Sequence, residues 1–91
     1  MRYHLQIEEE VKKQLQRLPG NLRQRIVRII EGLRDNPRPA NAIELTGILA
    51  GCYKIVLGQY RIVYEVFDDL VLVEVLRIGK KQGPEFYADI R

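Results

Sequence analysis

The sequence is poor in the residues on which metal centres and many active sites depend. It contains one cysteine, one histidine and no tryptophan. The lone Cys52 excludes an internal disulfide and a metal site built from several cysteines. The lone His4 cannot form a two-histidine metal or ribonuclease centre, and it falls on the polar side of an alternating segment, where we expect a surface residue. Catalysis, if present, must use lysine, arginine, tyrosine or carboxylate groups.

Long apolar runs are also missing. No segment approaches the roughly 20 consecutive apolar residues of a membrane helix, and the first ten residues do not resemble a signal peptide. We therefore expect a cytoplasmic protein that does not interact with membranes. The chain has 91 residues, which suffice for one modest core, so residues 1–91 are expected to form a single domain. Such a domain has little room for a large buried pocket, and function is expected on an exposed face.

The charge balance is mildly basic. The formal net charge is +3, which permits nucleic-acid binding without requiring it. Most charged residues between positions 11 and 38 are basic. A run of this kind is usually a solvated helical face, but it can also bind RNA or an acidic or amphipathic partner.

The hydrophobic pattern predicts an α+β fold. Residues 3–7 alternate as a strand does, and two helical patterns follow, separated by Pro19-Gly20 and with Asn21 as the expected cap of the second. A weak apolar stretch then precedes three strand-like segments and a short terminal helix at residues 85–91. The expected order is β-α-α-β-β-β-(α), with a helical hairpin packed on one face of a largely antiparallel sheet and the other face open.

Residues 52–66, CYKIVLGQYRIVYEV, are typical of a β-hairpin, because Gly58-Gln59 suits a two-residue turn. The register that follows pairs Val56 with Arg61 and makes Lys54 and Arg61 diagonal neighbours on the face away from the core. The residues expected on the core face are Tyr53, Ile55, Leu57, Tyr60, Ile62, Tyr64 and Val66. Two cations at this spacing can be solvated surface charges or can share one phosphate, and the hairpin alone leaves both interpretations open.

Residues 70–78 predict a central strand, rich in valine and leucine. Alternation places Arg77 on the same face as Val73 and Val75. Glu74 then lies among apolar residues on the other face, which an edge position or an ion pair would explain.

A basic loop follows this strand. Lys80 and Lys81 lie in the loop, and Phe86-Tyr87 come shortly after it. Together with Lys54 and Arg61, this cluster suits RNA chemistry. A phosphodiester gains negative charge when a ribose 2′-hydroxyl attacks it, so fixed cations stabilise the transition state more than the ground state. An exposed tyrosine can stack on a base or take part in proton transfer.

Several segments, in this order, resemble the RelE/ParE superfamily of bacterial and archaeal toxin–antitoxin toxins, and most closely the RelE-type mRNA interferases. The segments are LTG at 45–47, CYKI at 52–55, GQYRIVY at 58–64, IGKK at 78–81 and FY at 86–87. The resemblance covers essentially the whole chain. It implies a ribosome-dependent endoribonuclease that cleaves mRNA in the ribosomal A site without a metal or cofactor. It also implies a cognate antitoxin as partner, and operator DNA as a partner only of the toxin–antitoxin complex.

The resemblance also implies residue roles. Lys54 matches a catalytic lysine that assists 2′-hydroxyl deprotonation or stabilises charge, and Arg61 matches the arginine that holds the scissile phosphate. Lys81 stands where RelE-type members usually have an arginine that stabilises or helps protonate the leaving 5′-oxygen. Tyr87 matches the tyrosine that orients the substrate and stacks on it. Arg77, together with Lys80, Lys54 and Arg61, is expected to bind RNA.

Two departures from the family pattern affect the expected activity. Val56 replaces a second lysine, so part of the usual positive charge beside Arg61 is missing. Lys81 gives up the fork of an arginine but keeps a cation that can transfer a proton. Two alternatives stay open: a ParE-like inhibitor of DNA gyrase without nuclease activity, and a catalytically weakened antitoxin-binding protein. The sequence also leaves open whether Lys54 is a general base or acts only by its charge.

Overall fold

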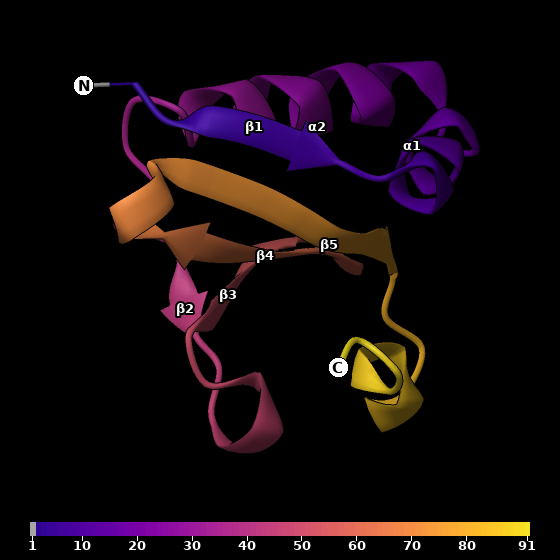
Figure 1. The fold of residues 1–91 in the computed structure, drawn as a ribbon. Helices are drawn as coiled ribbons and strands as arrows, with labels where there is room; N and C mark the ends of the chain where they lie inside the picture. The colour runs from indigo at the N-terminus through magenta and orange to yellow at the C-terminus, as the bar shows by residue number, and fades with distance from the viewer. Residues whose placement is uncertain (1) are drawn as a thin grey trace.

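The computed structural model describes residues 2–91 and consists of a pair of helices packed on a five-stranded sheet (Figure 1). The elements in chain order are β1 (His4–Ile7), α1 (Glu9–Gln16), α2 (Gly20–Gly32), β2 (Ile43–Glu44), β3 (Cys52–Leu57), β4 (Tyr60–Phe67) and β5 (Leu72–Lys80). Three 3₁₀ turns join them: η1 (Gly47–Leu49), η2 (Asp68–Leu70) and η3 (Pro84–Tyr87). Both helices cover one face of the sheet, whereas η1 and the C-terminal residues lie on the other side (Figure 1). The predicted α+β class and helical hairpin are confirmed.

The strand order across the sheet is β1-β5-β4-β3-β2. β1 runs parallel to β5, with His4 opposite Leu72, and the other neighbouring strands are antiparallel. The last strand is therefore the one that joins the N-terminal strand to the hairpin. β2 is a two-residue edge strand that the hydrophobic pattern indicates only as a weak apolar stretch.

The β3–β4 hairpin has the predicted register, in which Val56 lies opposite Arg61 and Lys54 opposite Val63. Gly58 has a φ of +59°, a conformation that glycine adopts without the steric cost of a Cβ atom. The helix-facing residues of the hairpin contribute to a core with α2 and β5. Its most buried members are Ile26, Ile30, Leu33, Ile55, Ile62, Tyr64, Val73, Val75 and Ile78. Packing on one face of the sheet leaves the other face for function.

Two predicted helix features are wrong. α2 begins at Gly20 with Pro19 as its N-cap, and Asn21 instead uses its side-chain oxygen to accept a bond from the Leu22 amide within the first turn. The predicted terminal helix is a single 3₁₀ turn, η3, followed by non-helical residues. One turn has too few internal hydrogen bonds to be stable by itself, so contacts with the sheet must hold it.

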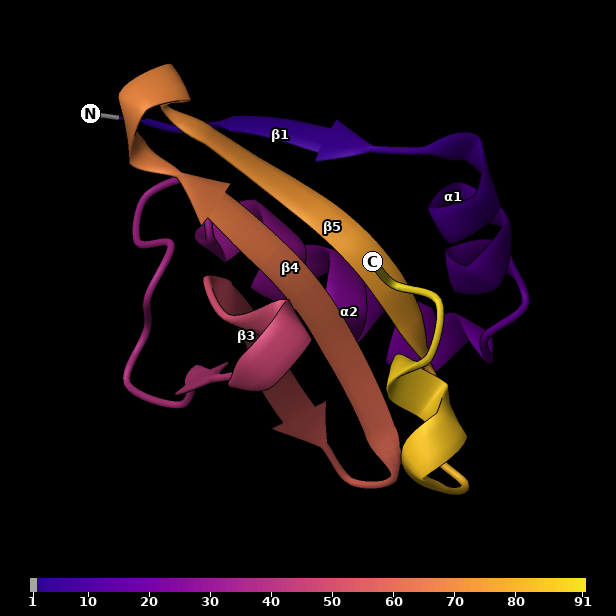
Figure 2. The same cartoon turned by 60° about the horizontal axis from the view of Figure 1, so that its bottom comes forward.

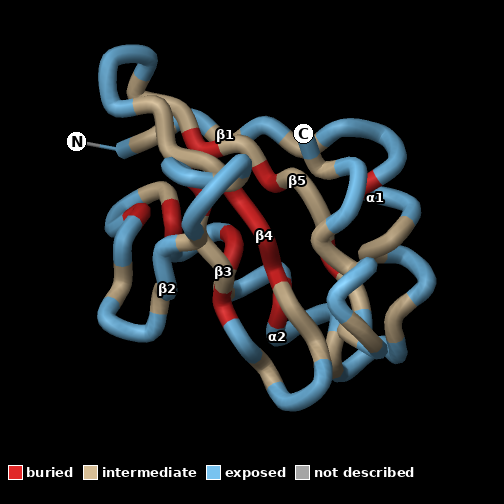
Figure 3. Tube along the Cα trace, turned by 90° about the horizontal axis from the view of Figure 1, so that it is seen from below, coloured by how far each residue is buried: buried red, intermediate tan, exposed pale blue. Residues whose placement is uncertain are grey.

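The sheet face opposite the helices is not fully open, which corrects the expectation. Residues 84–91 run across it, as Figure 2 shows. Cys52 and Val63, on this face, are 0% exposed. The middle of β4 is consequently covered on both sides, and it is drawn as buried in Figure 3.

A β-bulge in the β4–β5 pair changes which residues of β5 face the helices. Val63 lies opposite Arg77, but the next residue of β4, Tyr64, lies opposite Val75, so Leu76 is the extra residue. An extra residue shifts the alternation of side chains by one position. Arg77 therefore lies on the face away from the helices, and its predicted placement with Val73 and Val75 is wrong.

Glu74 is explained neither by an edge position nor by an ion pair. β5 lies between β1 and β4, and within residues 2–91 the Glu74 carboxylate takes part in no ion pair. Instead, Gln6 Nε2 donates a hydrogen bond to Glu74 Oε2 at 3.1 Å. Burial raises the pKa of Glu74, and the nearby carboxylates of Glu8 and Glu65 raise it further. Its usual charge is thus disfavoured in the folded protein.

Across residues 2–91, the helices are too short and too polar to cross a membrane.

Candidate functional site

The candidate site lies on the sheet face opposite the helices, where the β3–β4 hairpin meets η3. Lys54 comes from the middle of β3, and its Nζ lies 5.7 Å from the centroid of the Tyr87 ring, within range of a cation–π contact. The Phe86 ring meets the Tyr87 ring edge-on, with 5.3 Å between centroids. Figure 2 shows η3 beside the hairpin end of β4. The fold thus brings together a lysine and a tyrosine that are far apart in the sequence.

Arg61 is held against the hairpin turn. Its Nη1 donates to the carbonyl oxygens of Gly58 and Tyr60 at 2.9 and 3.0 Å. Its Nε atom and the Tyr87 hydroxyl are both buried, and neither has a hydrogen-bond partner among the described residues. An unpaired buried polar atom costs roughly 1–3 kcal/mol, so such atoms are uncommon and each one calls for an explanation, a catalytic role being one.

The basic loop is tied to the same turn. The Lys81 amide donates to the Gln59 carbonyl at 2.8 Å, and the two preceding residues, Gly79 and Lys80, pair with Arg61 and Tyr60. Lys81 therefore follows directly from the strand that adjoins Arg61. Lys80 is exposed. The structure places the four predicted catalytic residues, Lys54, Arg61, Lys81 and Tyr87, around one end of the hairpin.

Arg77 is directed at the protein's own backbone. Its Nη1 donates to the carbonyl oxygens of Phe86 and Ala88 at 2.6 and 2.7 Å. These contacts were not expected from the sequence, because alternation without the bulge points Arg77 at the helices. RNA binding by Arg77 stays a prediction that the structure does not test.

Sequence reasoning also missed Arg91. Its guanidinium forms an ion pair with Glu65 and donates to the carbonyls of Ile48 and Ala50 at 3.3 and 3.1 Å. The hydrogen bond to Glu65 raises the pKa of Arg91. Its partners are distant in the sequence and two of them are backbone atoms, so no sequence pattern indicates the contact.

Val56, where the resemblance implies a second lysine, is 41% exposed and lies directly opposite Arg61. A cation at this position would therefore stand beside Arg61 on the site's surface. The valine leaves this position uncharged.

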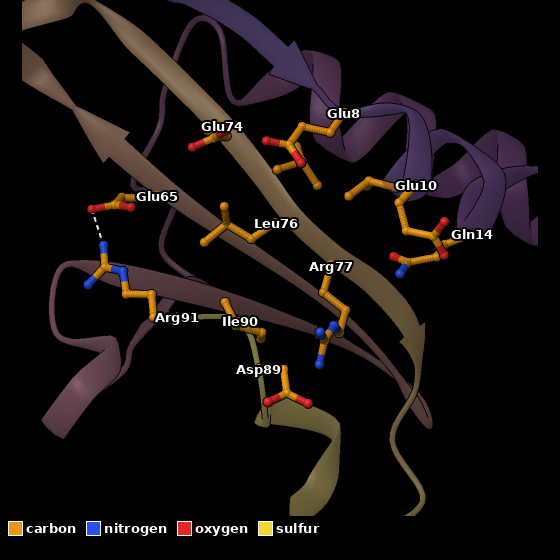
Figure 4. Close-up of a pocket in the computed structure, with 12 residues that line it drawn as sticks. Glu8, Glu10, Gln14, Glu65, Glu74, Leu76, Arg77, Asp89, Ile90 and Arg91 are labelled. Atoms are coloured by element: carbon orange, nitrogen blue, oxygen red, sulfur yellow. Dashed lines mark ion pairs between the residues drawn. The ribbon is translucent and has the colours of Figure 1, made fainter.

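A pocket of about 380 Å³ lies between α1, β5 and the last residues of the chain (Figure 4). Its charged lining residues are Glu8, Glu10, Glu65, Glu74, Arg77, Asp89 and Arg91. Acidic groups predominate, which repels phosphate, and neither Lys54 nor Arg61 lines it. Within residues 2–91 no group of histidine, cysteine or acidic residues is arranged to hold a metal ion. The basic cluster at the hairpin, rather than this pocket, is the candidate site for RNA.

Similarity to known proteins shows the family to which this chain belongs. Residues 5–83 match the family described as the ParE toxin of type II toxin–antitoxin systems. The chain belongs to the RelE/ParE family of toxins. The family membership predicted from the sequence is therefore confirmed.

Two relatives of this toxin are RelE proteins of Escherichia coli and Pyrococcus horikoshii. The mRNA interferase toxin RelE of E. coli strain K12 is 33% identical over 91 residues, which cover 98% of this chain and 94% of RelE. A mutant of E. coli RelE in the free state has a TM-score of 0.80 and 33% identity, covering 99% of this chain and 95% of that one. The archaeal RelE–RelB complex from P. horikoshii OT3 contains a chain with a TM-score of 0.74 and 30% identity. The match covers 92% of this chain and 99% of that one.

Proposed function

We propose that this protein is the toxin of a type II toxin–antitoxin system and acts as a ribosome-dependent endoribonuclease, cleaving mRNA in the ribosomal A site and so inhibiting translation. The observation that carries the proposal is the cluster of Lys54, Arg61, Lys81 and Tyr87 at one end of the hairpin. The similarity of the whole chain to an mRNA interferase also supports cleavage of mRNA. Its partners are the ribosome with its mRNA, a cognate antitoxin, and operator DNA through the toxin–antitoxin complex. The complex of a related RelE with RelB supports the proposal that an antitoxin binds this toxin.

The reaction uses the ribose 2′-hydroxyl as nucleophile. The 2′-oxygen forms a bond to phosphorus while the bond from phosphorus to the 5′-oxygen breaks. The 2′-hydroxyl gives its proton to water, the 5′-oxygen takes one from Lys81, and a proton from water restores Lys81. Arg61 holds the phosphate and stabilises the charge that develops on it. Lys81 stabilises the leaving oxygen and can supply its proton. Besides water, the scheme uses only side chains of the protein, and it requires no metal or cofactor.

Tyr87 and Lys54 act together in this scheme. Tyr87 presents an aromatic ring on which a base can stack, while Lys54, above that ring, contributes positive charge to the attacked phosphate. We assign Lys54 an electrostatic role. A pH–rate profile that stays flat for the wild type, together with loss of cleavage in Lys54→Ala, supports this role over base catalysis. A cleavage rate of the wild type that rises with pH, as a single group loses its proton, contradicts the electrostatic role of Lys54.

Primer extension on a defined mRNA tests the proposal. Purified protein is incubated with the mRNA, with and without programmed ribosomes whose A site is empty. We expect a new cut within the A-site codon only with ribosomes, and a loss of about 10²–10³-fold in rate for Arg61→Ala, as when one transition-state donor is removed from an active site. The matched control is Arg2→Ala, which removes an exposed cation paired with Asp35 away from the site.

Absence of any cut by the wild type, with ribosomes shown to be competent by a known A-site nuclease, would contradict the proposal. The second candidate is a ParE-like inhibitor of DNA gyrase, which the ParE description of the matching family favours. The two functions differ in their cellular effects. Translation arrest with intact chromosomes supports the nuclease, whereas filamentation with DNA-damage signalling supports gyrase as the target.

A further inference from the structure

The last residues of the chain are held to the sheet by two arginines. We call residues 84–91 the C-terminal strap. Arg77 binds the strap near its start, through the carbonyls of Phe86 and Ala88. Arg91 binds at its end, through Glu65 and the backbone around η1. Figure 4 shows Arg77 of β5 pointing toward the strap, and Arg91, at the end of the strap, pointing at Glu65.

The contacts of Arg77 are specific to the position of Tyr87. Phe86 and Ala88 are the residues immediately before and after Tyr87, and a single nitrogen, Nη1, binds both of their carbonyls at 2.6 and 2.7 Å. The guanidinium therefore fixes the backbone on both sides of the tyrosine. Hydrogen bonds from a charged donor are roughly twice as strong as neutral ones. Because η3 is only one 3₁₀ turn, these external bonds matter more for its placement than its own internal bonds do.

The β-bulge at Leu76 is what makes this contact possible. Without the extra residue, Arg77 would have the phase of Val75 and point at the helices. Bulges recur beside active sites, where they redirect a side chain. Here the redirected side chain reaches the segment that carries the proposed catalytic tyrosine.

We propose that Arg77 is a positioning residue for Tyr87: it acts through the backbone of the C-terminal strap rather than by contact with RNA. This inference rests on the proposed function, in which Tyr87 is catalytic. The competing role is a direct contact between Arg77 and an RNA phosphate through Nε or Nη2, since both bonds to the strap come from Nη1.

A double-mutant cycle separates the two roles. Arg77→Met keeps an aliphatic stem of similar length but has no donor, and we expect it to lower kcat for A-site cleavage about 10²-fold, the cost of misplacing a catalytic group by about an ångström, with little change in KM. Tyr87→Ala should lose a similar factor. The double variant should be no slower than Tyr87→Ala within about twofold, because Arg77 acts only through that residue.

A cleavage rate unchanged by Arg77→Met would overturn the proposal. So would effects that multiply in the double variant, since independent losses indicate a separate RNA contact. Arg77→Ala is carried in parallel so that the result does not depend on one replacement, and Arg2→Ala controls for the loss of a positive charge.

A second measurement does not depend on catalysis. The chain has no tryptophan, so Tyr87→Trp introduces a single tryptophan, excited selectively over the tyrosines, as a reporter at position 87. Adding Arg77→Met to this variant should shift the emission to longer wavelength and raise quenching by iodide about twofold or more, while adding Arg2→Ala should change neither. Emission that Arg77→Met leaves unaltered would show that Arg77 does not hold the strap. Failure of the wild type to cut mRNA would contradict the proposed function. The fluorescence measurement tests the position of residue 87 independently of cleavage.

Discussion

Glu74 is a carboxylate set into the interior of a sheet, with Glu65 opposite it on β4 and Gln6 beside it on β1. Burial and the neighbouring carboxylates raise its pKa in the folded protein. A raised carboxyl pKa means that the folded state binds the proton more tightly than the unfolded chain does. The free energy of unfolding therefore falls as the pH rises from the ordinary pKa of the carboxyl through the raised one.

We predict that Glu74→Gln increases the free energy of unfolding at pH 7 by about 0.5 kcal/mol, the scale of a partly exposed charge interaction. The amide removes the repelled charge but retains an oxygen that accepts the bond from Gln6. Urea titrations at pH 7 and near pH 4 check this, because the advantage should shrink at the lower pH, where Glu74 is protonated. Glu9→Gln, which alters an exposed carboxylate that pairs with Lys12, is the control, and equal gains in both variants would contradict the explanation.

At the residue scale, the sequence could supply the candidates but not their contacts. The exposure of His4 and the diagonal placement of Lys54 and Arg61 follow from strand alternation and a two-residue turn, and both are confirmed. The cation–π contact of Lys54 with Tyr87 could not be predicted. It depends on how a loop and a 3₁₀ turn return the chain to the sheet.

At the scale of elements, the hairpin was predictable and the bulge was not. A Gly-X turn between two β-branched strands leaves one register that buries an apolar face. In β5, residues 75, 76 and 78 are all apolar, so the sequence allows either residue 75 or residues 76 and 78 to face the core. The sequence therefore does not indicate that the strand contains an extra residue. The strap was mistaken for a helix for a related reason: its conformation is set by Arg77 and Arg91, not by its own propensity.

The hairpin also allows a prediction about catalytic strength. Val56→Lys places an ammonium opposite Arg61 on the exposed surface of β3, so we expect it to raise the rate of A-site cleavage about 10-fold by adding charge that favours the transition state. Primer extension with programmed ribosomes measures the rate. Leu70→Lys, which adds the same charge to the exposed turn η2, should leave the rate unchanged. If Val56→Lys is no faster than the wild type, the missing lysine does not limit this toxin.

The end of the strap can be tested through the lone cysteine. Cys52 is 0% exposed and lies opposite Glu65, the ion-pair partner of Arg91. Burial is the main cause that raises the pKa of its thiol. We predict that Arg91→Ala raises the rate of Cys52 labelling by a thiol reagent about 10-fold or more, because local opening needs less free energy than global unfolding. In the control Arg2→Ala, Cys52 should be labelled at the wild-type rate. If Cys52 is labelled no faster in Arg91→Ala than in the wild type, Arg91 does not anchor the end of the strap.

At the scale of the whole molecule, the helices and the candidate site occupy opposite faces of one sheet. Ile26 of α2 is 0% exposed in the core, whereas its neighbour Val27 is 41% exposed. We predict that Ile26→Ala lowers the free energy of unfolding by about 2–4 kcal/mol, while Val27→Ala changes it by less than about 0.5 kcal/mol. Urea titration measures both. Well below its melting temperature, Ile26→Ala should still cleave at the wild-type rate per folded molecule, and a loss of rate in the folded variant would show that the two faces are coupled.

The position of β5 also determines when the site can exist during synthesis. Lys54 and Arg61 leave the ribosome before β5, the strand that pairs with both β1 and β4, and Tyr87 follows later still. The parallel pair of His4 with Leu72 closes a loop that spans most of the chain, and such long-range pairing forms slowly. A nascent chain that ends before β5 consequently carries two cations of the cluster, Lys54 and Arg61, without the interior strand that pairs with β4. On the proposed function, the four catalytic residues therefore cannot come together until β5 and the segment that carries Tyr87 have been translated.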